Sequence, residues 1–238
     1  MNSQQFRVRV LSIRHLTRKI REITLEVVEP ETFHFLPGQA VAVTIPERGS
    51  EHPFLRYYSL ASPPRSSKRL SLLLNSADQG KGSSFLLEHE VGHEFQITGP
   101  YGSFVLQEDP NRKLIFVGTG TGIAPLWSMI ATLLETHSSR SMTLLWGLRS
   151  EPDIYYLDEL QAWTNQHKNF SFLLTLSQPS RQWDGKIGRV TDLLRELPAG
   201  DSLAVYVCGN RPMVKEVADL LKNNGDCRLY RERHHEGT

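Results

Sequence analysis

The feature that most constrains this chain is residues 114–125, which read LIFVGTGTGIAP. A short run of β-branched and aromatic residues is typical of a strand buried in a parallel sheet, and the alternate glycines after it let the backbone approach a ligand closely. Pro125 suits the first turn of a helix, where its missing N–H is no loss. Because uncovered N–H groups at a helix start attract anions, the stretch predicts a strand, a phosphate-sized loop and a helix; an ordinary β-to-α turn is the alternative.

The loop does not have the spacing of the standard dinucleotide-binding fingerprint. That fingerprint is Gly-x-Gly-x-x-Gly, with an acidic residue about 20 positions later. Here Gly118, Gly120 and Gly122 put the third glycine one residue early, and the next expected strand runs into Arg149 without a carboxylate. A P-loop is excluded because no Lys-Ser/Thr pair follows the glycines. By itself the loop indicates a phosphate and nothing more specific.

Charge and composition exclude several classes of protein. The 238 residues carry 27 basic and 26 acidic side chains, so no nucleic-acid footprint is expected. No apolar run approaches the ~20 residues of a membrane span, and residues 1–6 lack a secretion signal, which predicts a soluble cytoplasmic protein. Cys208 and Cys227 are too few for a disulfide framework, a four-thiolate zinc site or an iron–sulfur cluster. The adjacent His234 and His235 lie in a charged tail, so no metal site is expected.

Up to about residue 110 the chain has the pattern of an all-β domain. Residues 6–13 and 23–27 alternate between apolar and polar, as half-buried strands do. Further strands are expected at 40–45, 70–74 and 94–98, with one helical interruption at 83–89. Short strands punctuated by Pro-Gly and Gly-Pro turns predict a closed or nearly closed antiparallel barrel.

From residue 111 onward, strand and helix patterns alternate. Strands are expected at 114–117, 142–146, 170–176, 203–207 and 228–230, and helices at 126–136, 156–166, 190–196 and 212–223. Such alternation predicts a parallel sheet with helices on its faces. A polar, proline-containing stretch at 108–111 separates the two patterns, so we expect two domains, 1–109 and 110–238.

Three further stretches carry side chains suited to a ligand. Residues 56–59, RYYS, offer a permanent cation, flat rings and a hydroxyl, although a strand with ordinary surface tyrosines would look the same. In residues 80–84, GKGSS, Ser83 or Ser84 can cap the helix that follows, and the N–H groups there can receive a phosphate. A capped helix without a ligand is the alternative.

The third stretch is residues 205–213, VYVCGNRPM, which again predicts a strand, a turn and a helix. Ligands of open α/β sheets bind outside the carboxyl ends of the strands. Cys208 and Gly209 are therefore expected beside the 118–122 loop, across the same crevice. A buried, inert cysteine is the alternative.

Five motifs occur in one order along the chain. They are Arg-x-Tyr-Ser at 56–59, Gly-x-x-Ser at 80–83, Gly-Pro-Tyr-Gly at 99–102, Gly-Thr-Gly-Ile-Ala-Pro at 120–125 and Cys-Gly-Asn at 208–210. In this order they resemble the ferredoxin–NADP reductase family, and the resemblance spans residues 6 to about 232. It implies an antiparallel Greek-key flavin-binding barrel followed by a parallel-sheet domain that binds a pyridine nucleotide, with FAD and NAD(P)H as cofactors.

The resemblance also implies roles on the flavin side. Arg56 would bind the flavin phosphate, Tyr58 would pack on the isoalloxazine ring, and Ser59 would approach flavin N5. Ser83 would help to hold the diphosphate. The whole flavin-binding set expected from the resemblance is Arg56, Tyr57, Tyr58, Ser59, Gly82, Ser83 and Ser84.

On the nucleotide side, the glycine loop would cradle the dinucleotide, and Cys208 would lie near the reacting nicotinamide carbon. Glu232 matches the glutamate near the end of many members, whereas Arg233 stands where they carry an aromatic ring. Ser59, Cys208 and Glu232 form the expected catalytic set. The expected nucleotide-binding set is Thr119, Gly120, Thr121, Gly122, Arg149, Cys208, Gly209 and Met213.

Preference for NADPH usually goes with a Ser-Arg pair that binds the 2′-phosphate. This chain has Ser177-Gln178 there, and Arg149, Arg181 or Arg189 could compensate, so the sequence leans to NADH.

We expect hydride to pass from nicotinamide to flavin N5, with the rings within about 3–3.5 Å. Electrons would then pass to a separate acceptor such as a ferredoxin, a flavodoxin or an oxygenase component. A flavin reductase that uses diffusible flavin and an electron-transfer subunit of a larger complex are the alternatives.

Overall fold

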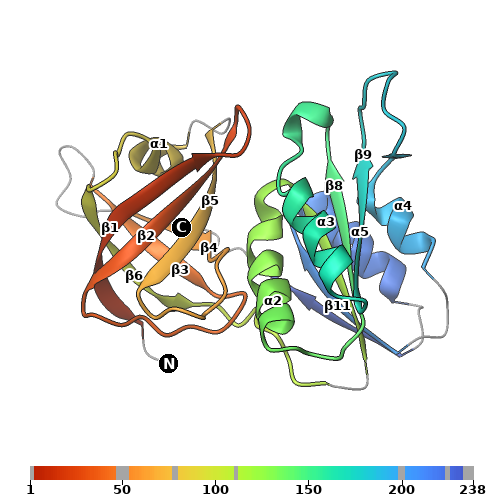
Figure 1. Ribbon diagram of the computed structural model, residues 1–238, viewed down its shortest axis with the longest axis horizontal. Helices are drawn as coiled ribbons and strands as arrows, with labels where there is room; N and C mark the ends of the chain where they lie inside the picture. Colours follow the sequence, from red (N-terminus) through yellow and green to blue (C-terminus); the bar gives the residue numbers. More distant parts are fainter. Residues whose placement is uncertain are drawn as a thin grey trace. The chain divides into compact units, whose positions relative to one another are not determined.

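The computed structural model describes residues 3–46, 54–76, 80–109, 112–197, 202–222 and 226–232. The chain forms two compact units, the first chiefly residues 3–106 and the second chiefly Gln107–Leu126 and Leu133–Glu232. Figure 1 shows the elements of both units, coloured along the sequence. The expected boundary between residues 109 and 110 remains a prediction, because Pro110 and Asn111 lie outside the described residues.

The first unit is a six-stranded antiparallel sheet that curves toward closure. Its elements are β1 (Gln4–His15), β2 (Ile20–Glu29), β3 (Ala40–Ile45), β4 (Phe54–Ser59), β5 (Arg69–Asn75), the short helix α1 (Lys81–Leu87) and β6 (Glu94–Tyr101). The strand order is β4-β3-β6-β1-β2-β5. An antiparallel bridge between Leu60 and Leu72 joins the chain just after β4 to β5, so the two edges of the sheet meet. The predicted antiparallel Greek-key barrel is confirmed in its architecture.

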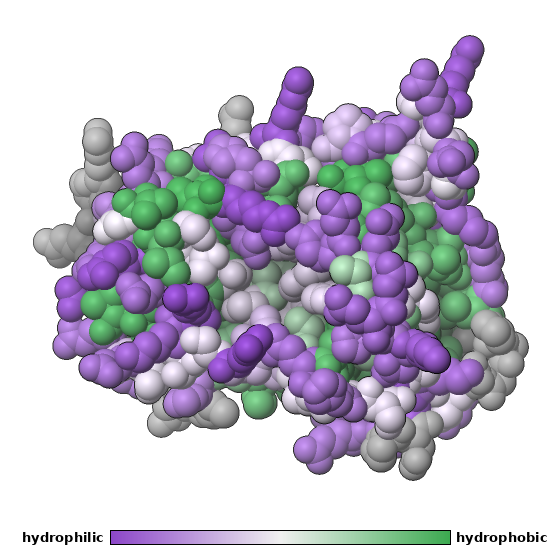
Figure 2. All heavy atoms as spheres, viewed as in Figure 1, coloured by the Kyte–Doolittle hydropathy of each residue, from purple (hydrophilic) through white to green (hydrophobic). Residues whose placement is uncertain are grey.

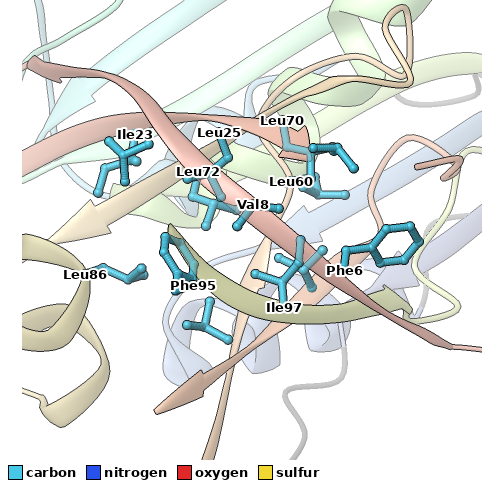
Figure 3. Close-up of a cluster of buried hydrophobic side chains, with 14 of the residues drawn as sticks. Phe6, Val8, Ile23, Leu25, Leu60, Leu70, Leu72, Leu86, Phe95 and Ile97 are labelled. Atoms are coloured by element: carbon cyan, nitrogen blue, oxygen red, sulfur yellow. The ribbon is translucent and has the colours of Figure 1, made fainter. Parts of the chain in front are cut away.

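The alternation read from the sequence separates the core from the surface of this unit. On β1, Phe6, Val8 and Val10 are buried, whereas Arg9 on the outer face bonds Glu94 of β6 at 2.7 Å. The inward residues of β1, β2, β3, β5 and β6, together with Leu60 and with Leu86 of α1, form one hydrophobic cluster (Figure 3). Phe54 and Tyr58 of β4 are partly buried and pack against it. The period-2 pattern therefore directs side chains as it does in any half-buried sheet.

Helix α1 begins earlier than expected, at Lys81, and its N-cap residue is Gly80. Ser83 and Ser84 lie inside the first turn, and the helix has no side-chain cap. The prediction that one of these serines caps the helix is therefore wrong. The physical reason is that Gly80 already takes the extended conformation that precedes a helix (φ −70°, ψ 141°), which leaves no cap position for a serine.

The second unit is a six-stranded parallel sheet with helices on both faces. Its strands are β7 (Lys113–Thr119), β8 (Met142–Leu148), β9 (Phe170–Leu176), β10 (Lys186–Ile187), β11 (Leu203–Cys208) and β12 (Cys227–Arg231). Its helices are α2 (Ile123–Glu135), α3 (Leu157–Gln166), α4 (Val190–Arg195) and α5 (Arg211–Leu221). The strand order is β10-β9-β8-β7-β11-β12. The predicted parallel α/β architecture is confirmed, and β10 is an additional strand that the sequence did not indicate.

The order of the strands reverses between β7 and β11. The chain moves outward from β7 to β10 and then crosses to β11 on the other side of β7. Helices α4 and α5 pack on the sheet face that carries Val117 and Val207, whereas α2 and α3 lie on the opposite face (Figure 1). Because α2 and α5 leave neighbouring strands toward opposite faces, the carboxyl ends of β7 and β11 lie at a topological switch point, which is where such sheets bind ligands.

The surface of both units is mixed in character. On the face seen in Figure 2, hydrophilic side chains are interspersed with smaller apolar patches. Within the described ranges, the exposed large apolar residues are Leu11, Leu36, Leu55, Tyr57, Val91 and Ile187. Among the described residues, no helix has the length and apolar character needed to cross a bilayer.

Candidate functional site

The candidate flavin site of the first unit is built where β4 faces the start of α1. Arg56 and Tyr58 lie two residues apart on β4 and therefore point to the same side of the strand. A Cβ atom on Gly82 would come within 2.7 Å of Arg56 Cγ and 2.6 Å of Tyr58 Oη. Only a glycine at this position lets the helix approach the two side chains so closely.

Tyr58 is tied into this site by its hydroxyl group. Burial raises the pKa of Tyr58, while a hydrogen bond with Ser83 and the positive charge of Arg56 act in the opposite direction. The phenol is therefore a neutral hydrogen-bonding group at physiological pH. Arg56 and Tyr58 on β4 are thus brought together with Gly82 and Ser83 on α1, which follow more than 20 residues later in the sequence, as expected.

Arg56 presents its charge at the surface of this site. Its Nη1 donates to the carbonyl of Leu55 at 3.0 Å, and its guanidinium carbon lies 4.7 Å from the centroid of the Phe54 ring. Both contacts leave the cation exposed. An exposed guanidinium beside a helix start suits a phosphate group.

The other predicted flavin residues are placed less uniformly. Tyr57 points to the opposite side of β4, where its ring meets Tyr101 edge-on at 5.3 Å, so Tyr57 and Tyr58 do not face the same side of the strand. Ser59 ends β4 opposite Ala40. Ser84 is half-buried in α1, and its carbonyl accepts the N–H of Glu88 at 3.0 Å.

The candidate nucleotide site of the second unit is formed by two turns that touch. Strand β7 ends in a single 3-10 turn, Gly120–Gly122, and Gly118 pairs with Cys208 of the neighbouring β11. A Cβ on Gly122 would come within 2.5 Å of the Cys208 carbonyl oxygen, and one on Gly209 within 2.2 Å of Thr119 Oγ1. The expected proximity of the two turns is thus present, and two glycines make it sterically possible.

Polar contacts lock the two turns together. The Thr119 hydroxyl oxygen accepts both the backbone N–H of Asn210, at 3.2 Å, and its side-chain amide, at 3.1 Å. Asn210 also caps α5, because its Oδ1 accepts the N–H of Met213 at 3.0 Å. Asn210 was part of the Cys-Gly-Asn motif but was not expected to act itself. The known preference of asparagine for the N-cap position of a helix was the sequence signal that could have shown this role.

The buried Cys208 and the half-buried Glu232 form a pair at the carboxyl end of β11. Cys208 is 2% exposed, and its thiol donates to Glu232 Oε2 at 2.8 Å. Burial raises the pKa of this thiol far above its ordinary value, and the charge of Glu232 and the hydrogen bond to it act in the same direction. Cys208 is therefore a protonated hydrogen-bond donor rather than a thiolate nucleophile.

Arg149 follows β8 and meets Gln178, which follows β9. Its Nε donates to Gln178 Oε1 at 2.9 Å, and the Gln178 N–H donates to the Arg149 carbonyl at 2.8 Å. Arg149 is exposed. Gln178, which occupies the position of the arginine in the Ser-Arg pair of NADPH-preferring members, is thus paired with Arg149 at the end of the neighbouring strand.

Two residues beside the glycine loop were not expected. Tyr155 and Trp146 both donate to the carbonyl oxygen of Gly120, at 3.0 and 3.4 Å. Nothing in their spacing distinguishes them from core aromatics. Among the described residues, no group of three or more potential metal ligands is present, and His234 and His235 lie outside that part of the chain.

Comparisons with known proteins define the class of this chain. A family model described as an oxidoreductase FAD-binding domain matches residues 7–106, and one described as an oxidoreductase NAD-binding domain matches residues 116–219. The chain is 33% identical over 229 residues to ferredoxin–NADP reductase B of Sorangium cellulosum, covering 93% of each protein. These matches define an FAD- and NAD(P)H-dependent oxidoreductase. The chain belongs to the ferredoxin–NADP reductase family.

Other relatives are longer than this chain. The reductase component of propane 2-monooxygenase from Mycolicibacterium goodii is 35% identical over 228 residues, and the alignment covers 93% of this chain but 64% of that protein. The Amycolatopsis cytochrome P450 reductase GcoB matches with a TM-score of 0.87 at 28% identity, covering 97% of this chain and 70% of that one. A Neisseria gonorrhoeae ferredoxin NADP+ reductase with bound FAD and NADP has the same fold, with a TM-score of 0.80 at 19% identity. The predicted enzyme class and the predicted cofactors, FAD and NAD(P)H, are confirmed.

Proposed function

We propose that this chain is a reductase that takes hydride from a nicotinamide dinucleotide and passes electrons to a separate acceptor protein, either a ferredoxin or the oxygenase component of an oxygenase system. The observation that carries the proposal is the glycine loop of β7 seated against the Cys208 turn of β11. Relatives named as reductase or electron transfer components of oxygenases support the choice of acceptor. A flavodoxin is the remaining acceptor class to be tested.

In the first unit, we assign the flavin-binding role to the cluster around α1. Arg56 would hold a flavin phosphate through its exposed guanidinium, and the close approach of Gly82 would leave backbone N–H groups of α1 beside that phosphate. Tyr58 would pack against the ring system, Ser83 and Ser84 would bind the diphosphate, and Ser59 would lie near the reacting edge. FAD supplies the centre that accepts hydride and releases electrons.

In the second unit, we assign the dinucleotide to the loop Thr119–Gly122 and to the turn that begins at Cys208. The Cys208 thiol would orient the nicotinamide as a neutral donor, and Glu232 would fix the direction of that thiol through their 2.8 Å hydrogen bond. Gly209 and Met213 would border the same site. No general acid or base is needed, because the protein has to bind, orient and shield the reacting groups.

We further propose a preference for NADH, with Arg149 bound to the adenosine half of the nucleotide. Gln178 places a neutral amide where a second guanidinium would bind a 2′-phosphate, and this amide also occupies Arg149 Nε. Gln178→Arg should raise kcat/KM for NADPH relative to NADH by about tenfold. Gln182→Arg adds the same charge to an exposed position of the same loop and should change the ratio less than twofold. A wild-type enzyme that already prefers NADPH would contradict the assignment.

The reductase activity is tested by anaerobic stopped-flow reduction with NADH, followed by mixing with a ferredoxin, a flavodoxin and an oxygenase component. Rapid reoxidation by one of these proteins supports the proposal. A protein that emerges colourless from gel filtration, and that reduces added free flavin, would instead be a flavin reductase with a diffusible substrate. The cytoplasmic location expected from the sequence also remains a proposal, which cell fractionation would test.

A further inference from the structure

The carbonyl group of Gly120 is held by an unusual number of donors. It accepts the hydroxyl of Tyr155 at 3.0 Å and the indole N–H of Trp146 at 3.4 Å. The backbone N–H of Ile123 also donates to it, which closes the 3-10 turn. A carbonyl oxygen has two lone pairs, so the donors of the protein itself use all the hydrogen-bonding capacity of this oxygen.

The two side-chain donors cannot readily move away. Trp146 is completely buried and Tyr155 is 5% exposed. Their rings meet edge-on at 4.8 Å, and the Tyr155 ring also meets that of Tyr156 at 5.1 Å. Burial raises the pKa of Tyr155 far above its ordinary value, so its hydroxyl keeps the proton that it donates.

Fixing this carbonyl also fixes the next N–H group. In a planar trans peptide the C=O of one residue and the N–H of the next belong to one rigid unit and point in opposite directions. The Gly120 carbonyl points toward the buried Trp146 and Tyr155, so the Thr121 N–H points away from them. Gly120 has φ +52°, and a Cβ there would meet nothing within 4 Å, so no other described part of the chain packs against the loop at the Cβ position of this residue.

We propose that Tyr155 and Trp146 are positioning residues of the nucleotide site, which hold the Gly120–Thr121 peptide so that its N–H faces the pyrophosphate of the dinucleotide. The inference rests on the proposed function, because it takes the glycine loop to be the nucleotide site. A prepositioned N–H binds an anion better than one that must be ordered on binding, because the ordering cost is met during folding. The two residues touch no substrate and act through the loop.

The test is Tyr155→Phe, which removes one oxygen atom and keeps the buried ring. In the full-length, flavin-loaded protein we expect KM for NADH and the dissociation constant for ADP-ribose to rise by about tenfold each, which corresponds to about 1.4 kcal/mol. ADP-ribose has the pyrophosphate but lacks the nicotinamide. We expect kcat to stay within about twofold and the flavin content to be unchanged. If Tyr155 had a merely structural role, its substitution would lower thermal stability and leave both constants unchanged.

The matched control is Tyr206→Phe. Tyr206 is also fully buried in the second unit, but its hydroxyl accepts the N–H of Gln107 at 2.9 Å, whereas the hydroxyl of Tyr155 donates to the Gly120 carbonyl. An equal rise in both constants in this variant would overturn the proposal, as would a Tyr155→Phe variant that binds ADP-ribose like the wild type.

Gly122→Ala separates failure of this proposal from failure of the proposed function. The added methyl would press on the Cys208 carbonyl and should raise KM for NADH sharply, with urea unfolding followed by tryptophan fluorescence as the check that the second unit is folded. If Gly122→Ala weakens nucleotide binding and Tyr155→Phe does not, the loop is the nucleotide site and the positioning role is wrong. If neither variant changes nucleotide binding, the assignment of the loop is itself wrong, and the positioning role falls with it.

Discussion

Removing the Cys208 thiol should change how the stability of the second unit depends on pH. The thiol is 2% exposed and faces the carboxylate of Glu232, and burial followed by that negative charge raises its pKa well above 9.0. In the folded state the proton is therefore retained at a pH where an unfolded thiol loses it. The contribution of the raised pKa to the free energy of unfolding is fully present below pH 9. It is lost as the pH rises from 9 toward the pKa of the folded state.

The magnitude follows from linkage. With an unfolded pKa of 9.0, raising the pH from 7 to 10 stabilises the unfolded chain by RT ln(1 + 10), which is about 1.4 kcal/mol. The slope above pH 9 approaches about 1.36 kcal/mol per pH unit, the value for one proton. Cys208→Ala removes this contribution. The wild type should therefore lose about 1.4 kcal/mol more stability than the variant over this range, whichever is more stable at pH 7.

Urea unfolding at several pH values measures the difference. Trp146, Trp163 and Trp183 all lie in the second unit, so tryptophan fluorescence reports chiefly on its unfolding. The raised pKa values of Tyr155 and Tyr206 give the same pH dependence in both proteins and cancel in the comparison. Parallel stability curves for wild type and Cys208→Ala up to pH 10 would refute the reasoning, because they would mean that the folded thiol ionises as readily as the unfolded one.

Two further predictions concern the first unit. Arg56→Ala should lower the ratio of flavin to protein after gel filtration several-fold, whereas Arg69→Ala, at an exposed position on β5, should leave it unchanged; full occupancy in Arg56→Ala would remove the phosphate-binding role. His89 and His93 stack at 3.6 Å, and burial, followed by the charge of His93, lowers the pKa of His89. The unfolded chain therefore takes up a proton first, and stability should fall as pH drops below 6.5. His93→Gln should lessen that loss in thermal melts between pH 7 and 5, and an unchanged loss would contradict the role of the stacked ring.

Most of the fold could be predicted because its signals are local. The period-2 alternation of β1 reports directly which side chains enter the barrel core, and the alternation of strand and helix patterns after residue 111 requires a parallel sheet. The start of α1 was mispredicted because serine is a strong cap former, whereas the extended conformation of Gly80 ends the need for one. The two-residue strand β10 carries too little pattern to be recognised.

The candidate site was predictable to the extent that its residues form motifs. The 56–59, 80–84, 118–122 and 208–209 stretches could be read because each combines glycines or charged and hydroxyl groups at a fixed spacing. The Tyr155–Gly120 bond could not be read, because a buried tyrosine leaves the same sequence signal whether its hydroxyl bonds a loop or any other acceptor. The Arg149–Gln178 pair joins the ends of two neighbouring strands, and it becomes visible only when the register of β8 and β9 is known.

In both candidate sites a glycine allows two distant segments of the chain to come into close contact, and this explains why each motif was ambiguous alone. In the first unit Gly82 lets α1 approach Arg56 and Tyr58, and in the second Gly122 lets the glycine loop approach Cys208. In each case the glycine belongs to one motif and the side chains or carbonyl that exclude a Cβ belong to another, far away in sequence. A glycine with an ordinary φ and no close neighbour accepts alanine without a clash, whereas these two exclude a methyl group by contact. The ordered set of motifs is therefore informative because its members require one another in space.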